Sequence, residues 1–234
     1  MLHPVEHPID QVVAKHLTAL LLDPLHSNQP ALIRPALEST KVFVLVKPEI
    51  LLPILSEITS AICVVTRRKN ERTVMFGPFK HIVDDEEPLR LLAYECLACL
   101  LPLCVARVDM FEFVESVLLG LADRINVKLT SQSIAVDLIN SSASAVMVEQ
   151  LATLLAAITE TLEIELPKNA LRQELDQQAE AVRSALKVVQ AVVKVPELER
   201  MYPVQAFFTE TVIDDVLEQY LKLGEKGPRD EMEF

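Results

Sequence analysis

Apolar residues recur at steps of three and four along most of this sequence, and that spacing constrains the fold more than any other feature. A helix places residues three and four apart on the same face, so each periodic segment predicts an amphipathic helix that buries one side. The predicted helices cover residues 8–23, 31–46, 49–65, 88–106, 109–124, 127–140, 145–164, 171–195 and 204–223.

The predicted helices form pairs that recur about every 35 to 45 residues, which is the period of HEAT and armadillo repeats. We therefore predict an all-α fold, a short HEAT- or armadillo-like array of helical repeats (an α-α superhelix). The sequence contains no strong internal self-match, so a globular helical bundle is the alternative. The predicted organisation is helical repeats at 1–65, a hairpin or loop insertion at 66–87, further helical repeats at 88–223 and a flexible tail at 224–234.

Composition agrees with a helical core and narrows the range of partners. Half of the residues are hydrophobic, which excludes a largely disordered chain. The chain has only 4 glycines, and most of its 14 prolines lie at the edges of apolar stretches. The formal net charge of −12 repels phosphate backbones and anionic membrane surfaces. From the composition we therefore predict that the protein binds neither nucleic acid nor a membrane.

The sequence also carries an expectation about location. The first ten residues contain Glu6, Asp10 and two prolines in place of the apolar core of a signal peptide. The longest apolar runs, such as residues 97–106, are too short to cross a bilayer. We therefore expect a soluble intracellular protein in the cytoplasm, the nucleus or both.

Residues 66–87 interrupt the helical periodicity. Two short β-prone runs, 72–76 and 79–83, lie on either side of Gly77 and Pro78. This pattern predicts a β-hairpin at about 72–83 or an ordered protruding loop. Gly-Pro is not the preferred two-residue hairpin turn, so both interpretations stay open.

The same segment contains the densest basic run of the chain, which consists of Arg67, Arg68, Lys69 and Arg72. Three interpretations fit it: a nucleic-acid contact, a solvated loop that keeps the apolar helices soluble, or a contact element for another protein. The overall negative charge disfavours the first. The third is the sharpest, because loops often carry binding function and apolar residues here alternate with charged ones.

No constellation of residues in the sequence suggests catalysis or a cofactor. Cys96, Cys99 and Cys104 resemble a ligand spacing, but a zinc site needs four convergent ligands and no histidine lies nearby. We predict that these three are buried structural thiols. The histidines have no partner at metal or triad spacing, and the glycines are too scattered for a phosphate loop. We therefore predict no enzyme activity, no cofactor and no metal site.

Three blocks of sequence carry a family resemblance. The most specific is Gly77-Pro78-Phe79-Lys80-His81-x-Val83-Asp84-Asp85, followed by Arg90, Ala93, Glu95 and Cys96. The second is Asp109-x-Phe111-Glu112-Phe113, followed by Gly120-Leu121-x-Asp123. The third combines Gln173-Glu174, Arg183-Ser184-Ala185 and Pro196-Glu197. These blocks resemble the C-terminal region of the CAND family, whose members are cullin-associated exchange factors dissociated by neddylation.

The resemblance implies a HEAT-repeat protein without chemistry of its own. Family members wrap around an unmodified cullin, and a β-hairpin from a C-terminal repeat occupies the region of the cullin N-terminal domain where the substrate adaptor binds. The implied function is competition with the adaptor, which promotes substrate-receptor exchange in cullin-RING ubiquitin ligases such as SCF complexes. The implied partner-binding residues are Arg72, Val74, Phe76, Gly77, Pro78, Phe79, Lys80 and His81, among which Phe76, Phe79, Lys80 and His81 are expected to face the cullin.

The length of this chain departs from the family pattern. Family members are several times longer, and their N-terminal repeats hold the cullin C-terminal domain and the RING subunit. The alternatives are a separate N-terminal HEAT-repeat chain of the same family that completes the solenoid, a reduced family member, or a fragment. The alternative function is a HEAT scaffold that binds another protein, such as a general transcription factor.

Overall fold

A computed structural model of the chain describes residue 12 and residues 15–77, 79–105, 107–141, 144–164 and 170–210. The chain divides into two compact units, residues 1–146 and residues 147–234. Helices make up most of the described residues of both units, and a two-stranded antiparallel sheet lies in the first. The predicted fold class, a helical repeat array with one protruding hairpin, is confirmed.

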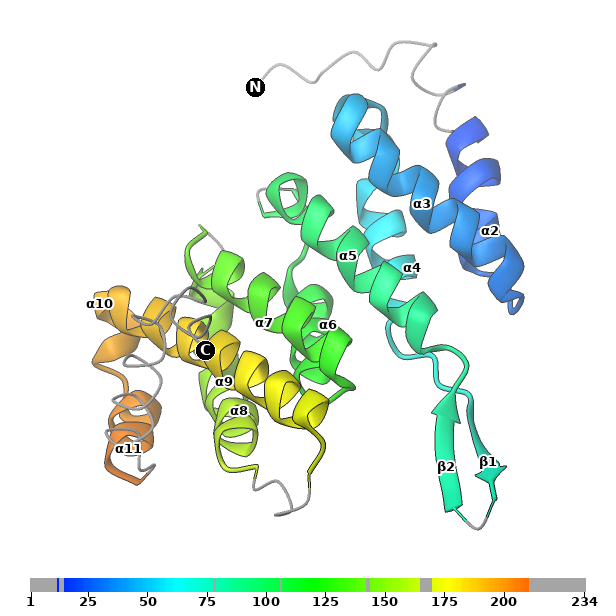
Figure 1. Ribbon diagram of the computed structural model, residues 1–234. Helices are drawn as coiled ribbons and strands as arrows, with labels where there is room; N and C mark the ends of the chain where they lie inside the picture. Colours follow the sequence, from blue (N-terminus) through cyan, green and yellow to red (C-terminus); the bar gives the residue numbers. More distant parts are fainter. Residues whose placement is uncertain are drawn as a thin grey trace, which may run out of the picture. The chain divides into compact units, whose positions relative to one another are not determined.

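In the first unit, helices both precede and follow the hairpin along the chain (Figure 1). Its elements are a π-helical turn (Thr18–Leu22), α2 (Asp23–Leu25), α3 (Pro30–Val46), two 3-10 turns (Pro48–Ile50 and Leu52–Ile54), α4 (Leu55–Val65), β1 (Glu71–Phe76), β2 (Phe79–Asp84), α5 (Glu87–Cys104), α6 (Phe111–Leu121) and α7 (Ile125–Ile139).

The helices of the first unit form two layers. In one layer α3 packs against α5, and α5 packs against α7. In the other layer α4 packs against α6. The layers are joined because α4 also contacts α5 and α6 also contacts α7. Helix pairs stacked side by side in this way are the arrangement of a HEAT-type array, in which each pair contacts its neighbours.

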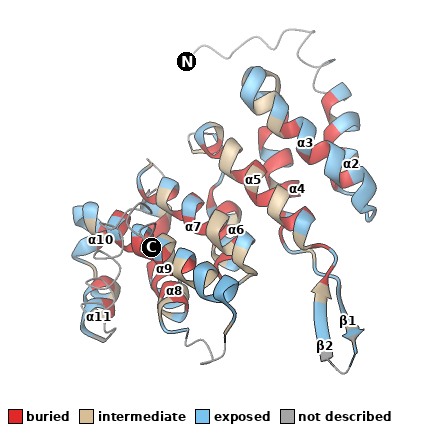
Figure 2. Ribbon diagram, viewed as in Figure 1, coloured by how far each residue is buried: buried red, intermediate tan, exposed pale blue. Residues whose placement is uncertain are grey.

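The core of the first unit lies between these two layers and is shown in red in Figure 2. Its members are aliphatic side chains that recur at helical spacing. Fully buried examples are Ile33, Leu37, Ile58, Ile62, Leu97, Leu100, Val117 and Ile134. Burial of one such side chain contributes about 1.5–3 kcal/mol, so the apolar periodicity of the sequence is the main source of the stability of the array.

Gly120 allows α6 to approach α5 and α7 closely. A Cβ atom at this position would lie 2.0 Å from Ser131 Oγ and 2.7 Å from Tyr94 Cζ. The Tyr94 hydroxyl donates a hydrogen bond of 2.7 Å to the carbonyl of Ser116, which fixes α5 against α6. A side chain at position 120 would force these helices apart.

The second unit is built from α8 (Ser144–Leu162, whose first three residues belong to the first unit), α9 (Arg172–Lys194), α10 (Pro196–Glu199) and α11 (Tyr202–Glu210). The side-chain amide of Gln178 on α9 donates a hydrogen bond of 2.9 Å to the carbonyl of Thr161 on α8. On α8, Leu151, Leu154 and Ile158 are buried at helical spacing. The amphipathic faces predicted for these segments are therefore the faces that pack.

Within the described residues, α8 is the helix whose length and apolarity would be sufficient to cross a membrane, over Ala145–Leu162. We expected every apolar run to be too short to cross a bilayer, and by length and composition α8 is an exception. A third of this window is buried. Length and composition alone are weak support for a membrane span, because core helices of soluble proteins share them.

The structure begins one predicted helix later than expected and describes only part of another. The helix predicted over 49–65 begins at Leu55, and two 3-10 turns take the place of its first part. Pro53 accounts for this, because it has no N–H to donate to the carbonyl of residue 49. Pro35, in contrast, lies inside α3, which is continuous. The helix predicted over 204–223 is present as α11 up to Glu210, and residues 211–223 lie outside the described residues, as does the predicted tail.

Candidate interaction hairpin

The hairpin projects from the helices between α4 and α5 (Figure 1). Strands β1 and β2 pair in an antiparallel register from Glu71 opposite Asp84 to Phe76 opposite Phe79. The turn begins at Gly77, whose φ of +61° is a conformation that side-chain-bearing residues rarely adopt. A glycine at this position therefore lets the chain reverse direction. The hairpin predicted at about 72–83 is confirmed and extends by one residue at each end.

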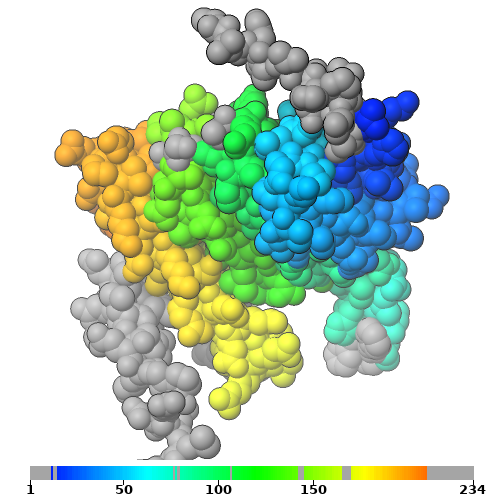
Figure 3. Space-filling model, turned by 90° about the horizontal axis from the view of Figure 1, so that it is seen from above, coloured from blue at the N-terminus to red at the C-terminus, as the bar shows by residue number. Residues whose placement is uncertain are grey.

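The structure places the predicted partner-binding residues unevenly. Four of them are exposed: Arg72, Gly77, Lys80 and His81. Val74 is half-buried, and the backbones of Phe76 and Phe79 pair next to the turn. Pro78 and the side chains of Phe76 and Phe79 lie outside the described residues. In the space-filling view the teal hairpin forms a lobe beside the blue and cyan helices of the same unit (Figure 3).

Strand alternation divides the hairpin into two faces. Directly opposed residues share a face, so Thr73 and Ile82 lie with Met75 and Lys80. All four are exposed, and the exposed fractions of Met75 and Ile82 are 55% and 61%. Sequence reasoning did not select Thr73, Met75 or Ile82. The period-2 alternation of the two strands was the signal that could have identified them.

A buried arginine holds the base of the hairpin. Arg90 on α5 is 1% exposed, and its Nη1 donates hydrogen bonds to Asp84 Oδ2 at 2.5 Å and to the carbonyl of Arg68 at 2.8 Å. Its Nε and Nη2 donate to the two carboxylate oxygens of Asp123, both at 2.8 Å. One guanidinium therefore links β2, the segment before β1 and the α6–α7 connection.

Two buried carboxylates beside one guanidinium require further compensation, which backbone amides supply. Burial by itself would raise the pKa of Asp84, but hydrogen bonds from the Asn70 amide, the Arg90 guanidinium and the Glu86 amide outweigh it and lower the pKa. Burial likewise opposes ionisation of Asp123, and hydrogen bonds from Arg90 and the Arg124 amide lower its pKa. Both carboxylates are therefore charged at neutral pH.

A second set of ion pairs surrounds this cluster. Arg68 forms two hydrogen bonds with Glu86, at 2.9 and 3.0 Å. Arg67 pairs with Glu115 at 2.7 Å, and Arg72 with Asp85 at 2.6 Å. Arg124 Nε lies 3.4 Å from Glu87, and its Nη2 donates to the carbonyl of Ile82 at 3.0 Å. These carboxylates neutralise the arginines of the basic run, which leaves less positive charge for a phosphate backbone.

The thiols and the remaining polar groups form no comparable arrangement. Cys63, Cys96 and Cys104 are buried, whereas Cys99 is half-buried, so the predicted burial is wrong for Cys99. In the described part of the chain, no group of three or more His, Cys, Asp or Glu side chains could hold a metal ion.

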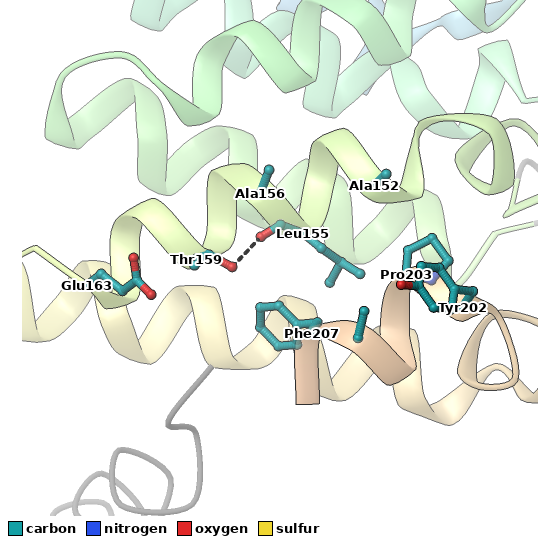
Figure 4. A pocket seen from close by; sticks show the side chains of 9 residues that line it. Ala152, Leu155, Ala156, Thr159, Glu163, Tyr202, Pro203 and Phe207 are labelled. Carbon is teal, nitrogen blue, oxygen red and sulfur yellow. Dashed lines mark hydrogen bonds between the residues drawn. The ribbon is translucent and has the colours of Figure 1, made fainter. Parts of the chain in front are cut away.

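The second unit contains an open pocket of about 580 Å³ between α8 and α11 (Figure 4). Its lining is largely apolar, with Leu155, Phe207 and Tyr202 contributing the largest side chains. The hydroxyl of Thr159 donates to the carbonyl of Leu155 at 3.0 Å, so its proton is already used within α8. Among the described residues of the lining, Glu163 is the only carboxylate, and these residues include no acid–base pair.

The fold and the hairpin together define a class: helical-repeat proteins that present a projecting β-hairpin anchored by a buried ion cluster. The model of the TIP120 family, described as TATA-binding protein interacting (TIP20), matches residues 50–215. The chain belongs to this family. The match includes the hairpin, both sides of its base and most of the second unit.

Similar proteins carry the names of cullin-associated proteins. The chain is 28% identical over 207 residues to cullin-associated NEDD8-dissociated protein 1 of Dictyostelium discoideum, covering 87% of this chain and 17% of that protein. It is 30% identical over 180 residues to cullin-associated NEDD8-dissociated protein 2 of Mus musculus, covering 77% of this chain and 13% of that protein. It is 28% identical over 195 residues to the relative named cullin-associated NEDD8-dissociated protein 1, C-terminal part, of Emericella nidulans, covering 82% of this chain and 19% of that protein. The predicted resemblance to the C-terminal region of CAND proteins is confirmed, and the chain spans less than a fifth of the length of each of these relatives.

The blocks that carried the family resemblance acquire physical roles in the structure. Asp84, Arg90 and Asp123 form the ion cluster at the base of the hairpin. Gly120 lies where Tyr94 of α5 and Ser131 of α7 leave no room for a Cβ atom on α6. The quoted residues therefore include those that fix the direction of the hairpin and the packing beneath it, in addition to residues at its tip.

Proposed function

We propose that the chain is a cullin-binding regulatory module whose hairpin docks on the cullin N-terminal domain. The hairpin competes there with the substrate adaptor and thereby promotes substrate-receptor exchange in cullin-RING ubiquitin ligases. The module acts by steric exclusion, in the cytoplasm, the nucleus or both. Membership of the family and the cullin-associated names of the relatives support the choice of partner.

The observation that carries this proposal is the anchored projection of the hairpin. A two-stranded hairpin alone is marginally stable in water, and this one contributes exposed apolar side chains instead of burying them in the array. Its base is nevertheless fixed by Arg90, Asp84 and Asp123. A binding element held in place before contact loses less conformational entropy on association.

We propose further that a separate N-terminal HEAT-repeat chain of the same family completes the array. The outward side of α3 supports this, because Val42, Leu45 and Val46 are exposed, the last two by 74% and 76%. An exposed apolar helix face at the end of a repeat array is a surface that a further repeat would cover. The length of the relatives is consistent with additional repeats.

The test is a binding assay with the purified cullin N-terminal domain, with and without its adaptor. Saturable binding that the adaptor abolishes is the expected result. A variant with residues 72–83 replaced by a short Gly-Ser turn should lose binding and retain the helical circular dichroism of the parent. Absence of binding, even after addition of an N-terminal chain, would overturn the proposal. A parallel titration with TATA-binding protein tests the alternative scaffold function.

A further inference from the structure

We infer that one face of the hairpin, formed by Thr73, Met75, Lys80 and Ile82, is its contact surface and fits an apolar protein surface that presents a carboxylate to Lys80. We call this the outer face. The inference rests on the proposed function, because it takes the hairpin to be the docking element, and it specifies which side of the hairpin binds and what chemistry the partner offers.

The register places these four side chains together. Thr73 is opposite Ile82, and Met75 is opposite Lys80. Opposed residues on antiparallel strands have Cβ atoms about 4.5–5.5 Å apart, so the four side chains form one contiguous patch. Met75 and Ile82 are more than half exposed, although each belongs to a type that is usually buried.

The other face of the hairpin is partly occupied by the chain itself. Val74 and Val83 are half-buried. Arg72, on the same face, is held by Asp85 at 2.6 Å. A partner that docked on this face would have to displace an ion pair and would find less exposed apolar area near the base.

The outer face is also fixed in direction. The carbonyl of Ile82 accepts a hydrogen bond of 3.0 Å from Arg124, at the start of α7. Two residues further along, Asp84 is held by Arg90. The helices of the repeat therefore control where Ile82 and its neighbours point, and the patch is preorganised for a contact.

Charge selects the partner chemistry. The arginines around the base are each paired with a carboxylate of this chain, as described above. Within the described part of the chain, no salt bridge involves Lys80, whose exposed side chain lies opposite Met75. An ammonium beside two apolar side chains favours a partner surface that combines apolar residues with a carboxylate.

The experiment compares the two faces in the full chain. The outer-face variant is Met75→Thr with Ile82→Thr, and the matched control is Val74→Thr with Val83→Thr, which keeps β-branched residues on the opposite face. Affinity for the cullin N-terminal domain is measured by calorimetry. Amide hydrogen exchange of the strands shows in each variant whether the hairpin is still folded.

We expect the outer-face variant to weaken binding by about tenfold or more and the control by less than about threefold. Lys80→Ala should in addition reduce the dependence of affinity on salt. If the control loses binding with a folded hairpin while the outer-face variant binds normally, the inference is wrong and the proposed function stands. If neither variant nor replacement of residues 72–83 changes the affinity, the proposed function fails with it.

Discussion

The carboxylate of Asp123 accepts two parallel hydrogen bonds, each 2.8 Å long, from the guanidinium of Arg90. The two residues are far apart in the sequence, one in the first turn of α5 and the other between α6 and α7. The same guanidinium holds Asp84 at the end of β2. The base of the hairpin is therefore tied through Arg90 to the packing of consecutive helix pairs.

Replacement of Arg90 by Met should be among the most destabilising single changes in the first unit. It leaves Asp84 and Asp123 buried without their cation, and removal of one partner from a buried ion pair costs about 3–5 kcal/mol. We expect a correspondingly lower urea midpoint and faster amide exchange in the hairpin.

The matched control is Arg67→Met, which removes an exposed pair with Glu115. Exposed pairs are worth about 0–1 kcal/mol, so this variant should unfold almost as the parent does. Equal effects of the two substitutions would show that Arg90 does not anchor the hairpin.

Acid should destabilise the first unit through the same cluster. The pKa values of Asp84 and Asp123 are lowered in the folded state, so the unfolded state binds more protons as the pH falls. Their contribution is complete above the ordinary carboxyl pKa of about 4 and is lost as the pH falls through the lowered values. Urea unfolding from pH 7 to pH 3 should show this loss.

The control for the acid effect is Asp123→Asn. This variant should be less stable than the parent at pH 7, and the difference should narrow as the pH falls, because only the parent loses a charge at position 123. A difference that stays constant over this range would mean that the Asp123 carboxylate is not linked to stability.

Gly120→Ala should separate α6 from its neighbours. The added Cβ would overlap both Ser131 Oγ and the ring of Tyr94, and that ring is held in place by the hydrogen bond from its hydroxyl to the carbonyl of Ser116. Overpacking of this kind costs about 1–3 kcal/mol. Leu119→Ala, at an exposed position of the same helix, is the control and should change the thermal midpoint little. Equal stability of Gly120→Ala and the parent would contradict the close approach.

The four thiols should differ in reactivity toward iodoacetamide. Burial raises the pKa of Cys63 to about 11, and burial also raises the pKa of Cys96 and of Cys104. The thiolate is the reactive form, so these three should react slowly in the folded protein. Cys99 is half-buried and should be modified first, as peptide mass mapping after a short exposure at pH 7.5 would reveal. Early modification of Cys96 would mean that α3 does not cover α5.

The helical architecture could be predicted because it depends on local periodicity. Apolar spacing located α5, α7 and α9 to within two residues, since α5 and α7 bury one face along their length and α9 buries one from Ala181 to Val192. The hairpin was predictable for a similar reason, because Gly77 and Pro78 interrupt two β-prone runs. These signals are contained within a few neighbouring residues of the sequence.

The anchoring of the hairpin could not be predicted, because it depends on contacts across the fold. In the sequence, Arg90 is a polar residue in an apolar helical segment, and no neighbouring residue indicates that Asp123 contacts it. Cys99 was expected to be buried like Cys96, yet Cys96 is buried with its thiol donating to the carbonyl of Leu37 on α3, whereas Cys99 is half-buried. Thr73, Met75 and Ile82 were not among the predicted residues, because that prediction rested on composition and resemblance rather than on strand register.

Gln132 offers a way to stabilise the array. Its side chain is fully buried on α7, and among the described residues neither its Oε1 nor its Nε2 has a hydrogen-bond partner. An unsatisfied buried amide costs about 1–3 kcal/mol, and Met has a similar volume without the polar atoms. Gln132→Met should therefore raise the urea midpoint. Gln178→Met is the control and should lower it, because Gln178 donates to the carbonyl of Thr161 at 2.9 Å. A lower midpoint for Gln132→Met would mean that a bound water satisfies the amide in solution.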